Sequence, residues 1–160
     1  MSNRLLLVLS ALLLLASQAN LAWMVAPLQP SILALQFAFK PQAYWRIIDL
    51  WGASGLALYR AHFSFDAVHP FIYGAFGYLL ITRTSLFDGS RLRSAVMLAL
   101  PLAGLFDLAE NTAQIFLLEQ AHGLDSIVIP ISATCSLLKW GLVGAFVVVV
   151  GVRWGRRRRR

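Results

Sequence analysis

Long apolar segments fill most of this chain and restrict what it can fold into. One begins at Leu5, and others lie near residues 94–118 and 127–152. About 20 consecutive apolar residues are enough to cross a lipid bilayer as a helix. Hydrophobic residues make up 59% of the 160 residues and charged residues only 13%, whereas soluble domains are about 45–50% apolar and about 25% charged. A soluble domain of this size could not bury so much apolar surface, and a disordered chain has the opposite composition.

The sequence therefore predicts an all-α fold, a polytopic membrane four-helix bundle, in a single domain covering 1–160. The expected spans are about 5–26, 60–82, 94–118 and 127–152. A cleaved signal peptide covering residues 1–19 is the alternative for the first span. The apolar run resumes beyond that point, which favours an uncleaved membrane anchor.

The segment between the first two spans, 27–59, is not an ordinary polar loop. Three prolines interrupt it, with amphipathic stretches between them. We expect short interfacial helices here, with Trp45, Trp51 and Tyr59 at the level of the lipid headgroups. A lid over a lipid-facing site is the alternative role for this segment.

The positions of the basic residues predict the orientation of the chain. Arg83, Arg91 and Arg93 lie between the second and third spans, and six of the 14 Lys and Arg residues lie in the last eight positions, in the Arg tail 153–160. The positive-inside rule then predicts that both termini lie in the cytoplasm, and the membrane that we expect is a bacterial inner membrane. The tail is expected to contact anionic lipid headgroups. A net charge of +7 that is distributed so unevenly does not indicate a nucleic-acid-binding protein.

The third predicted span carries polar side chains where lipid disfavours them. They are Asp107, Glu110, Asn111 and Gln114. Their i, i+3, i+4, i+7 spacing places them on one face of a helix. Two ionised acids in a bilayer cost roughly 5–7 kcal/mol, about as much as the apolar residues of this span return. This face is therefore expected to turn toward the bundle interior or a wet cavity, unless its acids carry protons.

The second predicted span carries a matching polar face. His62, Asp66, His69 and Tyr73 recur at helical spacing. Pro70, inside that helix, cannot donate a hydrogen bond to the carbonyl of Asp66. The freed oxygen is expected to point toward the same neighbourhood as the Asp66 carboxylate.

The fourth predicted span carries Lys139 near its middle, on one face with two serines and Cys135. A single cysteine cannot form an internal disulfide. A buried ammonium without a partner is costly, so a carboxylate partner is expected. Asp107 is the first candidate, and we predict a salt bridge between it and Lys139. Glu110 is the second candidate.

Two short motifs stand out in the second and third spans. They are Asp66-x-x-His69-Pro70-x-x-Tyr73 and Phe106-Asp107-x-x-Glu110-Asn111. These motifs resemble those of small four-span bacterial membrane proteins of unknown function. The resemblance covers the second to fourth spans, about half of the chain. It implies a four-span membrane fold and brings no established activity.

Three converging polar faces indicate a buried acid/base cluster, and an ionisable residue inside a membrane is a functional hypothesis by default. The first interpretation is an intramembrane enzyme that acts on a lipid or isoprenoid-like substrate. Its predicted catalytic residues are Asp66, His69, Asp107, Glu110 and Lys139, and its predicted substrate-binding residues are Tyr73, Asn111 and Gln114. The alternatives are proton- or cation-coupled transport by an oligomer and a non-catalytic lipid-binding or assembly factor. Polar contacts that only hold the helices together are the non-functional explanation.

The sequence requires no cofactor. A single divalent metal is compatible with Asp66, His69, Asp107 and Glu110, because acid–His and acid–acid pairs one helical turn apart can supply ligands. Membrane lipids are the expected partners, and the sequence is also compatible with a homo-oligomer.

Overall fold

The computed structural model describes residues 3–159, and every regular element in that range is a helix. The helices are α1 (Asn3–Val25), α2 (Ile32–Gln36), α3 (Pro41–Asp66), α4 (His69–Arg83), α5 (Arg93–Leu118) and α6 (Val128–Arg158). The predicted all-α fold is confirmed. The last helix continues through most of the predicted Arg tail, so Arg153 to Arg158 are helical.

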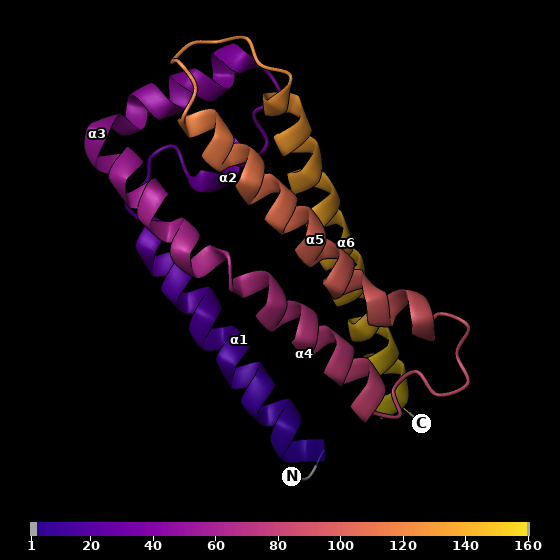
Figure 1. Cartoon of the computed structure of the whole chain (residues 1–160). Coiled ribbons are helices and arrows are strands. Elements are labelled where there is room, and N and C mark those ends of the chain that lie inside the picture. Colours follow the sequence, from indigo (N-terminus) through magenta and orange to yellow (C-terminus); the bar gives the residue numbers. More distant parts are fainter. Residues whose placement is uncertain (1–2, 160) are drawn as a thin grey trace.

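The long helices form a layered bundle in the order α1, α4, α5, α6 (Figure 1). Helix α1 packs on α4 and on α3, α4 packs on α5, and α5 packs on α6 over most of its length. Both termini lie at the same end of the molecule, and the α5–α6 loop lies at the opposite end. Helices α1 and α6 are therefore the two edges of the arrangement, and α4 and α5 lie between them.

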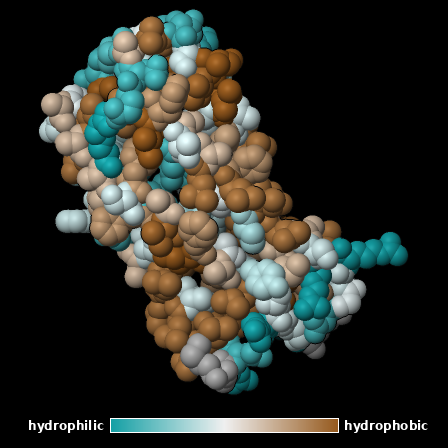
Figure 2. Space-filling model, in the orientation of Figure 1, coloured by the Kyte–Doolittle hydropathy of each residue, from teal (hydrophilic) through white to brown (hydrophobic). Residues whose placement is uncertain are grey.

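Within residues 3–159, three helices, α1, α5 and α6, are long and apolar enough to cross a membrane. Only 6% of the most apolar stretch of α1 is buried inside the protein, against 44% of that of α5. On the face shown in Figure 2, hydrophobic residues cover much of the middle and hydrophilic residues gather toward the ends. Helix α1 thus presents its apolar side chains outward, whereas α5 is the central helix.

The predicted single helix over 60–82 is wrong, because this segment consists of two helices. Helix α3 ends at Asp66 and α4 begins at His69. Pro70 lies in the first turn of α4 rather than inside a continuous helix, since it has no N–H to donate to the preceding turn and its ring crowds that turn. Helix α4 has 15 residues, about 22 Å at 1.5 Å per residue, which is shorter than the roughly 30 Å of a bilayer core.

The segment between α1 and α4 supplies most of a hydrophobic core, to which Leu117 of α5 and Ile129 of α6 also belong. Gly52, at φ 59°, bends α3 into two parts, a backbone conformation that glycine adopts without a Cβ clash. Trp45, Trp51 and Tyr59 are buried against Leu28 and neighbouring apolar residues. These rings therefore pack inside the protein and are not turned toward lipid headgroups as expected.

Helices α4 and α5 approach closely because small residues lie between them. A Cβ placed on Gly104 would lie 3.2 Å from the carbonyl oxygen of Pro70, and one on Gly77 would lie 2.9 Å from the Cβ of Leu100. Small residues allow this kind of close packing between helices in membranes. The contact fixes the distance between the helices that carry Tyr73 and Asp107.

We expect Gly77→Val to destabilise the bundle, because its Cβ would force α4 away from Leu100. Overpacking of this kind costs about 1–3 kcal/mol. Gly144→Val, on α6, is the matched control, since a Cβ there meets nothing within 4 Å. Thermal unfolding of the two variants in one detergent measures the difference. Equal midpoints for Gly77→Val and wild type would contradict close α4–α5 packing.

Candidate functional site

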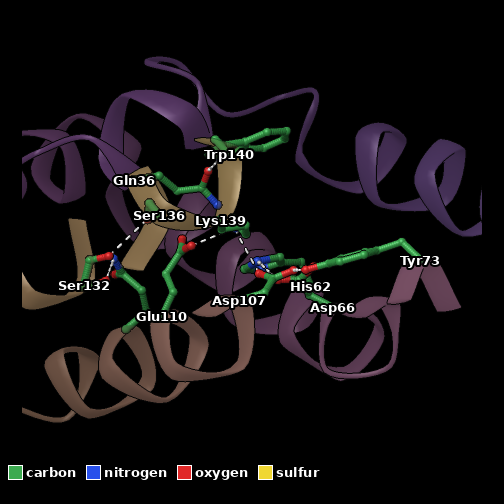
Figure 3. A network of polar contacts seen from close by, with 11 residues as sticks. Gln36, His62, Asp66, Tyr73, Asp107, Glu110, Ser132, Ser136, Lys139 and Trp140 are labelled. Carbon is green, nitrogen blue, oxygen red and sulfur yellow. Dashed lines mark hydrogen bonds and ion pairs between the residues drawn. The ribbon is translucent and has the colours of Figure 1, made fainter. Parts of the chain in front are cut away.

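The polar faces of α5 and α6 meet in a buried ion triad formed by Asp107, Glu110 and Lys139. The Nζ atom of Lys139 lies 3.0 Å from Oδ1 of Asp107 and 2.6 Å from Oε2 of Glu110. None of the three residues is more than 6% exposed. The predicted salt bridge between Asp107 and Lys139 is confirmed, and the second candidate, Glu110, binds the same ammonium (Figure 3).

Helical geometry explains how the triad forms. Asp107 and Glu110 lie one turn apart on the buried face of α5, so both carboxylates reach the same side of the helix. Tyr73, on α4, donates its hydroxyl to Oδ2 of Asp107 at 3.0 Å. Each oxygen of Asp107 therefore has a donor, one from α4 and one from α6. The triad thus ties together three helices.

A cavity of about 630 Å³ opens beside the triad, between the edge helices α1 and α6. Its walls are mostly apolar side chains of α1, α6 and the segment that follows α1. The ionisable residues that line it are His62, Asp66, His69, Tyr73, Asp107 and Lys139. The four polar residues predicted on the second span therefore face one cavity, although the helix that was expected to carry them is broken.

The histidines of the cavity and Asp66 make contacts outside the triad. The Nε2 atom of His62 lies 3.8 Å from Oδ2 of Asp66, and the other ring nitrogen of His62 contacts the backbone carbonyl of Tyr59. The Nδ1 atom of His69 lies 2.9 Å from the hydroxyl of Ser17, on α1. Asp66 is therefore the acid of the cavity with the most distant partner, whereas His69 is bound to a neutral hydroxyl rather than to an ion.

Three of the predicted site residues do not line the cavity. They are Glu110, Asn111 and Gln114. Gln114 accepts a hydrogen bond from the hydroxyl of Tyr44 at 3.0 Å and donates one to the hydroxyl of Ser132 at 2.8 Å. Asn111 is buried, and its amide nitrogen has no hydrogen-bond partner among the described residues. The placement of Asn111 and Gln114 gives no support to a role in substrate binding.

Side chains that sequence reasoning did not single out also surround the cavity. Trp140 donates its indole N–H to Oε1 of Gln36 at 3.0 Å, which ties α2 to α6 (Figure 3). Both residues line the cavity, together with Ser31 and Ile32. The segment around α2 therefore lines one side of the cavity. Only the path of this segment in space reveals its position, because its sequence has no charged motif.

The sequence left a divalent metal possible at four side chains, but among the described residues these do not form a group that could hold one. Within residues 3–159, no three His, Cys, Asp or Glu side chains lie close enough together to hold one metal ion. Asp107 and Glu110 are instead bound to Lys139. No family model, curated protein or solved structure matches this chain. The resemblance drawn from the two motifs therefore stays a prediction, and the function has to be argued from the site itself.

We expect Lys139→Met to destabilise the protein strongly, because it leaves two buried carboxylates without their shared cation. Removing one partner of a buried ion pair costs about 3–5 kcal/mol. The triple variant Asp107→Asn, Glu110→Gln and Lys139→Met removes every charge of the triad and should be more stable than the single variant. Unfolding midpoints in one detergent measure both.

Arg60→Met is the control, because it breaks the exposed 2.7 Å pair between Arg60 and Glu119. Exposed pairs contribute about 0–1 kcal/mol. A single Lys139→Met variant as stable as wild type would contradict a triad of ionised groups.

Proposed function

We propose that the protein is a four-span membrane protein of the bacterial inner membrane with both termini in the cytoplasm. The proposed spans are α1, α5, α6 and the continuous path formed by the second part of α3 with α4. Figure 1 supports this path, because α4 follows α3 in nearly the same direction beside α1. The location of both termini at one end, where the arginines of α6 also lie, agrees with the positive-inside rule.

We propose that the cavity binds an apolar chain with a polar end, as in a lipid or isoprenoid-like substrate. The observation that carries this proposal is that the walls of the cavity are mostly apolar, whereas its ionisable residues come from α3 to α6. We call these ionisable residues, His62, Asp66, His69, Tyr73, Asp107 and Lys139, the floor of the cavity. A volume of about 630 Å³ falls within the range of about 300–1,000 Å³ for ligand pockets. The opening between α1 and α6 would face the lipid, so a ligand could enter from the membrane.

In this proposal, helix α1 stays in the functional protein and is not removed as a signal peptide. Leu14, Leu21 and neighbouring side chains form one wall of the cavity. Ser17 contacts the ring of His69. Cleavage near residue 19 would remove the contact with His69 and part of that wall.

The proposed chemistry is proton transfer to and from the polar end of the ligand by an intramembrane enzyme. Asp66 and His69 both face the cavity, and a carboxylate and an imidazole are common general acids and bases. The ion triad would position this floor, with Tyr73 and Asp107 joined by a hydrogen bond. Apolar walls would keep water away from the reacting groups, which strengthens every electrostatic interaction there.

Coupled transport has less support than enzyme chemistry. Between the triad and the end that carries both termini, the buried described residues form a hydrophobic cluster. It includes Ile81, Leu86, Phe87, Val96 and Phe146. A proton or cation relay needs polar groups along the whole path. The proposal therefore places the chemistry at one site rather than along a channel.

We expect the protein purified in nanodiscs to retain a lipid that native mass spectrometry detects. Val143→Trp should reduce its occupancy, because Val143 lines the cavity. Val148→Trp is the matched control, since Val148 lies on the same helix and is 63% exposed. Equal occupancy in the two variants would contradict ligand binding in this cavity.

We expect the protein to exchange protons with one lipid of a total membrane extract. After incubation in D₂O and a return to H₂O, which removes deuterium from O–H and N–H groups, mass spectrometry should detect deuterium bound to carbon in that lipid or in a product. His69→Gln should slow this reaction by about 100-fold or more, the usual contribution of a general acid or base. His122→Gln, at an exposed pair with Asp49, is the control. A retained lipid without any exchange would instead identify a non-catalytic lipid-binding factor.

A further inference from the structure

The floor of the cavity has an excess of negative charge. Asp66, Asp107 and Glu110 supply three carboxylates at or behind the floor, and Lys139 supplies one ammonium. With neutral histidines, three negative charges and one positive charge leave an excess of two negative charges. A proton on any one of the acids still leaves one negative charge. Protons on two of the acids, charged histidines or a bound cation would balance this charge, and of these a bound cation is the one that a ligand can supply.

Lys139 is not free to bind an anion. It is the one Lys or Arg among the described residues that line the cavity. Its ammonium is already bound to Asp107 at 3.0 Å and to Glu110 at 2.6 Å. A phosphate or carboxylate headgroup placed here would face carboxylates in a low-dielectric site, where like charges repel strongly. The geometry therefore disfavours an anionic ligand.

Asp66 is the carboxylate that a ligand could reach. Its side chain is 14% exposed, compared with 4% for Asp107 and 2% for Glu110. Its distance of 3.8 Å from the ring of His62 is too long for a hydrogen bond. Unlike Asp107, whose oxygens are held by Lys139 and Tyr73, Asp66 has capacity for a further donor.

The negative floor is not a consequence of the overall composition, because the chain as a whole has a net charge of +7. The basic residues lie elsewhere, and those of α6 from Arg153 to Arg158 are on its exposed terminal turns. The charge of the cavity is therefore opposite in sign to that of the molecule. Such a local reversal selects ligands by the charge of their polar end.

We propose that the ligand of this cavity carries one positive charge, as a protonated amine on a single apolar chain, and that its ammonium group binds Asp66. An ammonium group has three N–H donors, and the two carboxylate oxygens of Asp66 are acceptors. The apolar chain would lie between α1 and α6, against Leu21 and Val143. This inference rests on the proposed function, because it names the chemical class of the amphiphile that the cavity binds.

Competition among three single-chain probes tests the inference. Dodecylamine, dodecanol and dodecyl phosphate share one apolar chain and differ in the charge of the polar end. Their affinities are measured with the full chain in phosphatidylcholine nanodiscs, and empty discs correct for partitioning. We expect dodecylamine to bind at least about tenfold more tightly than dodecanol, which corresponds to about 1.4 kcal/mol, and dodecyl phosphate to bind most weakly.

Asp66→Asn should reduce the preference for dodecylamine to about twofold or less, whereas Asp66→Glu, which keeps the charge, should retain it. Asp49→Asn is the control, because Asp49 is exposed and pairs with His122 outside the cavity. If Asp66→Asn does not fold, the order of the three affinities in wild type still decides the question.

Two results would overturn the inference, and they can be told apart. If dodecanol or dodecyl phosphate binds as tightly as dodecylamine, and Val143→Trp abolishes that binding, the ligand is not cationic although the cavity still binds an amphiphile. If Val143→Trp affects none of the probes, the cavity is not the binding site. In that case the proposed function fails together with the inference.

Discussion

The ion triad of Asp107, Glu110 and Lys139 is the interaction on which the rest of the structure depends. Three charged groups are removed from water, and each of the two carboxylates on α5 lies within 3.0 Å of the ammonium on α6. Such groups are costly in a low-dielectric interior unless each one is paired. Their mutual pairing explains why α5 can be the most buried of the three membrane-capable helices although it has the lowest hydropathy of the three. It also fixes the depth at which α5 and α6 meet.

The cavity follows from the same arrangement. Helices α4 and α5 are held close by small residues, and α5 and α6 by the triad, whereas the edge helices α1 and α6 leave a space between them. The broken path from α3 to α4 turns Asp66 and His69 into that space. Two kinds of ionisable group result. The members of the triad are paired with one another, whereas Asp66 and His69 line the cavity outside the triad. The proposed chemistry belongs to the second kind.

Much of the site could be predicted from the sequence because helical spacing fixes which side chains share a face. The face of Asp107 and Glu110 is buried as expected, and the need of a buried ammonium for a carboxylate correctly paired Lys139 with Asp107. The break before His69 was missed, although Pro70 was the signal for it. Ser17 and Gln36 were also missed, because their contacts depend on which edges of α1 and α2 lie beside the cavity.

The sequence by itself determined that the chain is helical and apolar enough for a membrane, and that its buried charges need partners. These properties depend on composition and local periodicity, which the order of residues fixes directly. Only the tertiary structure decided that Lys139 binds two acids at once, that Gln114 is held by Tyr44 and Ser132, and that Asp66 lines the cavity. Those outcomes depend on the distances between helices far apart in the chain, and close packing of side chains sets these distances.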